Sequence, residues 1–347
     1  MMMRRRLLIV LLMVFTACND PGSSVTPGSP EQGWREETLD VEPARYFAVE
    51  PLGDGRLLLL NAASEDPSDT VASVFSPDEG TQQDLALPED KRCLRTRFLH
   101  PEPTGARSVD FVKACSGQDG RFRYSLVRYD LASEKTRTII GETDFFEVAN
   151  SGVVGPITRG PAASDMLTGI GDAMCSSFAF LDAAGVRFPT LEVDVGGATW
   201  SPADLSTEVG RSCERGSGGS PAWAPDGHAV AFAASTDIAR FEGFARLDAS
   251  WDVFTAPPDL STASAVLQGV VAPGLLTWSP DSSGIAFRGR VGGQDGTWIL
   301  DPSTGDVELV AAEQAEALAW ASNDRLLAAF PPPSLVEGPS RVVMLTR

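Results

Sequence analysis

Two recurring hairpin patterns constrain the fold of this chain more than any other feature of its sequence. In the first, an apolar strand is followed by a turn rich in Pro, Asp and Gly and by a second apolar strand. Pro presets φ at the turn, Asp accepts bonds from nearby backbone amides, and Gly adopts the left-handed conformation, so each copy predicts a β-hairpin. The copies lie at 221–232 and 276–287, with weaker ones at 318–327 and 49–58.

The second pattern is a strand that ends in an apolar residue and Asp, then a short polar turn and an apolar return strand. Its copies lie at 126–140, 178–193, 244–254 and 298–310, and 74–87 belongs with them by position. The two patterns alternate along the chain. Trp278 follows Trp223 by 55 residues, and Trp320 follows Trp278 by 42. A period of this length that contains two hairpins is typical of a four-stranded propeller blade.

These repeats predict an all-β chain that forms a six-bladed β-propeller of four-stranded antiparallel blades over residues 36–347. We place the inner strands near residues 45, 95, 146, 222, 277 and 318, with an insertion at about 195–220. The last blade lacks a fourth strand after residues 342–345, and the strand-like segment Glu36–Val41 is unused. We therefore predict that this N-terminal strand completes the last blade and closes the ring, which removes an exposed sheet edge.

The motif Trp-[Ser/Ala]-Pro-Asp at Trp223–Asp226 and Trp278–Asp281, with a looser copy at Trp320, resembles the TolB-like propeller repeat, a relative of the WD repeat. The resemblance is weak over residues 90–215. It implies a six-bladed propeller of a bacterial envelope, in a family that often serves as an interaction module. The matched residues are turn and core residues, so we expect Trp223, Trp278 and Trp320 to pack between blades. No catalytic residue and no cofactor is implied.

The N-terminus is typical of an export signal. Residues 1–17 combine three Arg with an apolar run that is too short to cross a bilayer. The following Phe15-Thr16-Ala17-Cys18 resembles a bacterial lipobox, which implies cleavage before Cys18 and its lipidation. An ordinary signal peptide with a chance cysteine is the alternative. Residues 18–35 would then be the lipidated Cys and a flexible Pro/Gly/Ser tether. We expect a protein held at the cell envelope, periplasmic or on the outer surface, through the lipid anchor alone.

The charge of the chain limits its partners. Residues 1–17 carry no acid, so the chain from Cys18 onward has 25 basic and 47 acidic residues, a net charge of −22. Such a body repels phosphate backbones, so we expect no nucleic-acid partner. A cationic envelope protein or ligand is compatible with this charge.

Four cysteines remain after Cys18, and an even number in an exported chain favours disulfides. They allow three pairings, of which we favour Cys93–Cys115 and Cys175–Cys213 because each brackets a local segment. A metal site is disfavoured, since there is no Cys-x-x-Cys and His100 and His228 are the only histidines. We predict no metal and no cofactor.

The acid-bearing connections at residues 65–69, 115–119, 235–242 and 292–295, joined by the insertion at about 195–220, are expected to be long and to gather on one face of the propeller, opposite the tight turns. Loops on a rigid scaffold often carry function. The binding candidates on this face are Asp66, Asp69, Asp119, Asp237 and Asp295.

We favour a monomeric propeller that binds an unknown envelope protein or ligand over an enzyme. The alternative is a glycan hydrolase or lyase that uses paired carboxylates, because pairs formed across blades are invisible in sequence. A nucleophile elbow is absent, and two histidines leave little room for a Ser-His-Asp site. We assign no catalytic residue. A purely structural propeller is the third possibility.

Overall fold

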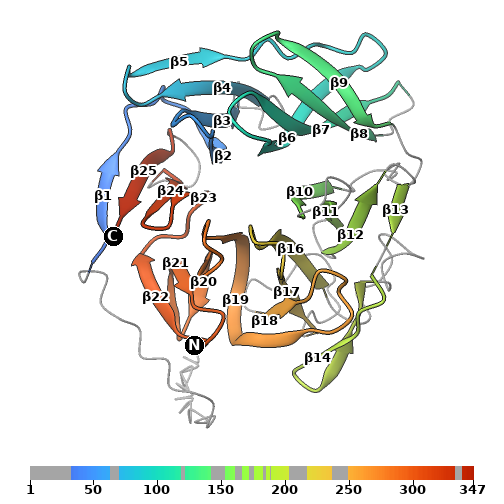
Figure 1. The fold of residues 1–347 in the computed structure, drawn as a ribbon, viewed down its shortest axis with the longest axis vertical. Helices are drawn as coiled ribbons and strands as arrows, with labels where there is room; N and C mark the ends of the chain where they lie inside the picture. The colour runs from blue at the N-terminus through green and yellow to red at the C-terminus, as the bar shows by residue number, and fades with distance from the viewer. Residues whose placement is uncertain are drawn as a thin grey trace, which may run out of the picture.

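Antiparallel sheets arranged around a common axis make up the structure (Figure 1). The computed structural model describes residues 33–62, 70–118, 122–141, 153–160, 166–171, 176–182, 185–187, 189–202, 217–236, 249–332 and 338–347. Within these ranges there is no helix whose length and hydropathy would let it cross a bilayer.

The described strands form six four-stranded antiparallel units, which confirms the predicted β-propeller. Blade 1 contains β2 (Tyr46–Pro51), β3 (Leu57–Ala62), β4 (Thr70–Ser76) and β5 (Thr81–Asp84). Blade 2 contains β6 (Arg95–Pro103), β7 (Ser108–Ser116), β8 (Phe122–Asp130) and β9 (Lys135–Ile140). Blade 3 contains β10 (Val153–Arg159), β11 (Met166–Gly171), β12 (Ser176–Asp182) and β13 (Gly185–Arg187).

Blades 4 and 5 form one continuous seven-stranded sheet because they share a strand. Blade 4 contains β16 (Ser217–Trp223), β17 (Val230–Ser235), β18 (Ser250–Ala256) and β19 (Ser264–Trp278). The same β19 pairs with β20 (Ile285–Val291), which is followed by β21 (Gln294–Leu300) and β22 (Val307–Ala311). The sequence did not predict this shared strand. Blade 6 contains β23 (Ala317–Ser322), β24 (Arg325–Phe330), β25 (Arg341–Thr346) and β1 (Arg35–Thr38).

The inner strands of blades 1, 2, 4, 5 and 6 include or closely adjoin their predicted positions. In blade 3 the inner strand β10 begins at Val153, seven residues after the predicted position, and residues 142–152 lie outside the described ranges.

A hairpin, β14 (Val193–Val195) and β15 (Ala198–Trp200), occupies the start of the predicted insertion. Trp200 is fully buried against Phe178 and Phe232, so this part of the insertion belongs to the core and not to a surface loop.

The predicted ring closure is confirmed. Strand β1 pairs antiparallel with β25, with Arg35 opposite Thr346 and Thr38 opposite Val343. Figure 1 shows β1 beside β25 at the outer edge of the last blade. The strand starts one residue earlier and ends earlier than predicted, although the amide of Leu39 still donates to the carbonyl of Val342.

The three repeat tryptophans lie between blades, as expected. The indole of Trp278 donates to the carbonyl of Ala222 in blade 4 (3.0 Å), and Trp320 donates to the carbonyl of Thr277 in blade 5 (3.1 Å). Trp223 is buried in a cluster that includes Leu167 of blade 3. Each tryptophan therefore packs on the preceding blade, and this repeated contact builds the core at the seams between blades.

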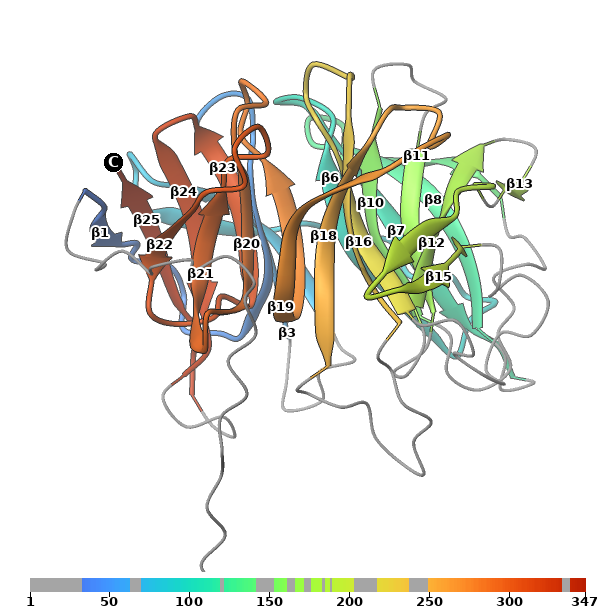
Figure 2. The ribbon, with the colours of Figure 1, turned by 90° about the horizontal axis from the view of Figure 1, so that it is seen from below.

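The propeller has two distinct faces, visible from the side in Figure 2. The turns between first and second strands and between third and fourth strands lie on one face, named here the turn face. The other connections lie on the opposite, link face. The C-terminus is on the turn face, because the amide of Arg347 donates to the carbonyl of Asp324 in the β23–β24 turn. Arg35 pairs beside it, so the chain also enters the ring at the turn face.

One connection expected to be long on the link face is short. Val291 pairs with Gln294, which leaves Gly292 and Gly293 as a two-residue turn. Both glycines have positive φ, 58° and 86°, as a tight hairpin of this kind requires. The expectation of a long loop at residues 292–295 was wrong because two consecutive glycines allow the strands to continue to the turn itself.

Candidate functional site

Most of the residues singled out from sequence lie outside the described residues. These are Cys18, Asp66, Asp69, Asp119, Cys175, Cys213 and Asp237. Asp295 is described and lies in β21. Its carboxylate accepts bonds from Arg290 (3.0 and 3.1 Å) and from Gln314 (2.8 Å), and the Arg290 bond lowers its pKa. A binding role for Asp295 stays a prediction, and a ligand there would compete with Arg290.

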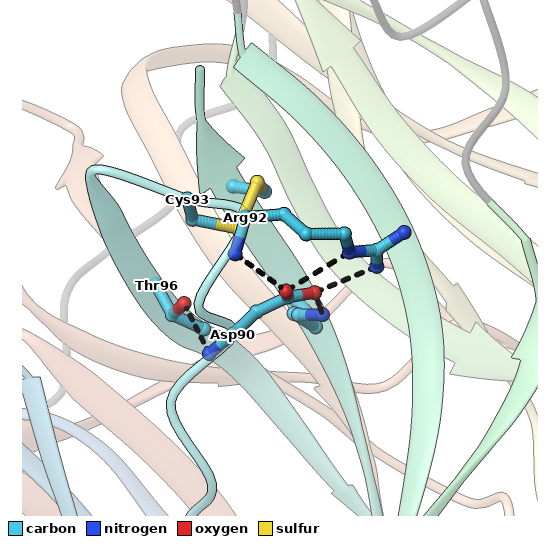
Figure 3. The surroundings of a disulfide bond; sticks show 6 residues. Asp90, Arg92, Cys93 and Thr96 are labelled. Atoms are coloured by element: carbon cyan, nitrogen blue, oxygen red, sulfur yellow. Dashed lines mark hydrogen bonds and ion pairs between the residues drawn. A yellow bond between two sulfur atoms is a disulfide. The ribbon is translucent and has the colours of Figure 1, made fainter. Parts of the chain in front are cut away.

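The disulfide predicted between Cys93 and Cys115 is present, with a Cα–Cα distance of 5.3 Å. It ties the connection before β6 to strand β7. Next to it, Asp90 accepts bonds from Arg92 and from Lys113 (2.6 Å), while its amide donates to Thr96 (Figure 3). These bonds hold the pKa of Asp90 well below its usual range. The connection is thus fixed on β7 by one covalent bond and one ionic cluster.

A second charged cluster, which sequence reasoning missed, lies at the turn-face end of the inner strands of blades 1–3. The residues one place before the end of the inner strand are Glu50, Glu102, Thr158, Ala222 and Thr277 in blades 1 to 5. The last residues are Pro51, Pro103, Arg159, Trp223 and Trp278. Charged side chains occur at these positions only in blades 1–3, so this part of the ring departs from the repeat.

Alternation along the strands shows where the two glutamates point. Ala48 and Leu52 pack in the core cluster between blades 1 and 2, so Glu50, two residues from each, faces blade 2. Glu102 is paired across the sheet with Asp110. Directly opposite residues share a face, and here it is the face toward blade 3.

Asp110 is the buried centre of this cluster, with no exposed surface. Its carboxylate accepts two bonds from Arg128 on β8 (2.7 and 3.0 Å) and forms an ion pair with Arg159 of blade 3. Arg159 occupies the strand position at which blades 4 and 5 have Trp223 and Trp278. At this position the contact between blades 2 and 3 is an ion pair. The corresponding contacts between blades 3 and 4 and between blades 4 and 5 are made by tryptophan side chains.

The environment raises the pKa of both glutamates. Burial raises the pKa of Glu102 to about 7, and the charge of Arg159 opposes part of this effect. Burial also raises the pKa of Glu50 well above its usual range, and the neighbouring charge of Glu102 adds to it. Neither carboxylate forms a hydrogen bond or ion pair with the described part of the chain. The shifts arise because neither charged form has a bonded donor to replace lost water.

We define the channel cluster as Glu50, Glu102, Asp110, Arg128 and Arg159. It gathers carboxyl groups of raised pKa and two guanidinium groups near one end of the inner strands of blades 1–3, a combination suited to acid–base chemistry or to polar ligand binding. Its sequence signal is slight: Glu50 and Glu102 each precede a proline at the end of an inner strand. Among the described residues, no three His, Cys, Asp or Glu side chains lie together in a way that could hold a metal ion.

Fold and blade construction define the class of this protein as a β-propeller with four-stranded antiparallel blades. The sequence matches no family model and no curated protein. Among solved structures it is similar to TolB from Acinetobacter baumannii, with a TM-score of 0.54 and 14% identity over 85% of this chain and 64% of that chain. The chain thus spans less than two thirds of the length of that TolB.

Two further solved structures share the fold over almost their whole length. A putative TolB from Agrobacterium tumefaciens has a TM-score of 0.50 and 11% identity, over 90% of this chain and 97% of that chain. Oligogalacturonate lyase from Vibrio parahaemolyticus has a TM-score of 0.50 and 12% identity, over 93% and 96%. At these identities the similarity establishes the fold, which binding proteins and enzymes share.

Proposed function

We propose that this protein is exported, lipid-anchored at Cys18, and acts as a binding module for an envelope protein or ligand. The observation that supports the proposal is the position in the chain at which the first strand of the ring begins. Strand β1 starts at Arg35, and Trp34 just before it donates to Glu308 of β22 (3.1 Å). The 16 residues from Cys18 to Gly33 therefore remain to connect the lipid to the body.

The entry point of the chain favours one orientation. Such a tether reaches about 55 Å when fully extended and about 20–25 Å when relaxed. Because it joins the ring at the rim of the turn face, that face lies nearest the anchor. The link face, where we predict the acidic candidate residues, then points away from the membrane and is the face that we propose for partner binding.

Replacing Cys18 with Ser tests the anchor. We expect Cys18→Ser to move the protein from the membrane fraction to the soluble envelope fraction, because the acyl chains supply the membrane affinity. Ser23→Ala, in the same tether, is the matched control and should stay with membranes. Membrane fractionation of the Cys18→Ser variant equal to wild type would contradict the proposal.

The Glu50–Glu102 pair favours a second candidate, a glycan hydrolase or lyase. Glycosidic bond cleavage uses two carboxyl groups, and a pKa near 7, as at Glu102, suits a general acid or base at neutral pH. The substrate in the name of the Vibrio structure, oligogalacturonate, is a suitable first probe because Arg159 could contact its carboxylates.

An assay of oligogalacturonate cleavage separates the two candidates. If the protein is an enzyme, new reducing ends or unsaturated products should form, and Glu102→Gln should lower the rate at least about 100-fold, as expected on loss of an acid–base group. Glu89→Gln, on the connection before β6, should leave the rate unchanged. No cleavage by the wild-type protein of this substrate or of envelope glycans would count against the enzyme and leave the binding module.

A further inference from the structure

Blade 2 and the connection that leads into it carry the opposite charge to the rest of the chain. Residues 85–140, which comprise this connection and the four strands of the blade, contain 11 basic and 7 acidic residues. The rest of the chain from Cys18 onward contains 14 basic and 40 acidic residues, so a net charge of +4 stands beside one of −26. Because charges more than about 8 Å apart are largely screened at physiological ionic strength, a partner that contacts blade 2 meets its local positive charge.

Several of these basic residues lie at the link-face end of blade 2. Lys91 and Arg92 belong to the connection before β6, Lys113 lies near the end of β7, and Arg123 lies near the start of β8. Arg123 is directly opposite Cys115, and Lys113 is two residues from Cys115 along β7, so both are on the face of the sheet that carries the disulfide. Basic residues from three segments therefore lie around the disulfide.

Two basic side chains and one apolar side chain of the connection are exposed. The side chain of Arg92 is 73% exposed, and Lys91 is also exposed. Leu94 is 68% exposed, and within the described part of the chain it is the one large hydrophobic residue that is exposed. An apolar group with cations beside it is thus presented to solvent on the link face.

The connection is held against β7 by bonds on both sides of Arg92. The disulfide fixes it covalently, and the amide of Leu94 donates to the carbonyl of Ser116 (2.8 Å). The carboxylate of Asp90 accepts bonds from Arg92 and Lys113 (Figure 3). Single exposed leucines are common on protein surfaces. A leucine on a fixed backbone differs from them, because a partner that covers it has little chain entropy to remove.

We propose that Lys91, Arg92 and Leu94, named here the basic tip, form a docking site for an acidic segment of a partner protein that also carries an apolar side chain. This inference rests on the proposed binding function and names the chemistry of the partner. Carboxylates of the segment pair with Lys91 and Arg92, and its apolar side chain covers Leu94, a combination of charged and apolar contacts that protein interfaces use.

Two other anionic partners fit the basic tip less well. An acidic glycan offers carboxylates but no apolar side chain to cover Leu94. A lipid surface would lie at the turn face in the orientation proposed above, whereas the connection before β6 is on the link face. The exposed leucine and the position of the tip therefore favour a protein segment.

Binding of labelled synthetic peptides to the full chain, followed by fluorescence anisotropy at physiological ionic strength, tests the proposal. The probe is a peptide of Glu with Leu at every fourth position, and a peptide with Lys in place of Glu is its counterpart. We expect the Glu/Leu peptide to bind, and Lys91→Glu and Leu94→Ser each to weaken its binding at least about fivefold.

Two control variants should bind the Glu/Leu peptide as the wild type does. Lys135→Glu makes the same change of charge at an exposed position of the outer strand β9 of the same blade. Leu94→Met keeps an apolar side chain at the tip. Because Lys91 and Leu94 are exposed, their substitution should leave the melting temperature unchanged, so a weaker affinity reports the contact itself.

Absence of binding by the Glu/Leu peptide, or wild-type affinity in both Lys91→Glu and Leu94→Ser, would overturn the proposal. Oligogalacturonate or phosphatidylglycerol vesicles that bind the tip more tightly than the peptide would assign it to a glycan or a lipid surface and would also overturn it. Binding of the Lys/Leu peptide without the Glu/Leu peptide would overturn the basic tip while leaving the proposed binding function in place.

Discussion

Arg159 is the residue at which this propeller departs most clearly from its own repeat. Where blades 4 and 5 place Trp223 and Trp278 at the end of the inner strand, blade 3 places an arginine that contacts the fully buried Asp110. Aromatic packing would be expected to stabilise the seam at least as well as a buried ion pair, because moving charges out of water is costly. An arrangement that gives up this stability marks a candidate functional site.

Replacing Asp110 with Asn should destabilise the protein strongly. Arg128 and Arg159 would then face a neutral amide in a buried position, and loss of one partner of a buried ionic cluster typically costs about 3–5 kcal/mol. Urea unfolding at constant pH measures the loss. The control is Asp226→Asn, an exposed turn residue that accepts a bond from the amide of His228 and should cost about 1 kcal/mol or less. An Asp110→Asn variant as stable as this control would contradict the assignment.

Strand β1 is the element on which the closed ring depends. Its four side chains are all exposed, so it adds almost nothing to the core and acts through its backbone pairing with β25. Contacts on either side hold it in place: Trp34 bonds to Glu308 and packs edge-on against Trp320, and Arg341 bonds to Glu36. Without β1, the edge of β25 would be exposed, which invites aggregation.

Shortening the chain tests this role. A chain that starts at Pro43 should unfold at a lower temperature and aggregate more than one that starts at Gly33, because it lacks β1 and Trp34. A chain that starts at Gly33 should behave like one that starts at Asn19. Trp34→Ala in the longer chain should cost about 1–3 kcal/mol, from one hydrogen bond and one aromatic pair. Equal melting temperatures for the Pro43 and Gly33 chains would show that β1 does not stabilise the ring.

At the scale of the whole molecule, the propeller has a regular part and a modified part. Blades 4–6 carry the repeat tryptophans and the Pro/Asp-type turns, and the turns bond to one another, as in the bond from the amide of Asp281 to Asn323. Blades 1–3 carry the channel cluster and the Cys93–Cys115 disulfide. The regular part is best understood as scaffold, and the modified part is where ligand binding or catalysis should be sought.

The sequence by itself determined the features that follow local rules. Turn residues and alternating apolar positions predicted the hairpins, their period predicted four-stranded blades, and the strand missing from the last blade predicted closure by the N-terminal segment. The pairing of Cys93 with Cys115 was also predictable, because the two cysteines bracket a short segment. Each of these inferences uses only residues that are close together in the sequence, or the number of strands that the sequence supplies.

Only the tertiary structure decided which charged residues meet. Asp110 and Arg159, which form an ion pair, belong to two different blades, and each looks in the sequence like an ordinary polar residue of a strand. Likewise, Trp200 lies in a segment that was expected to be an insertion, yet it completes the core against Phe178 and Phe232. These contacts depend on how the ring closes, and ring closure brings together residues for which no local rule of turn or strand formation gives a signal.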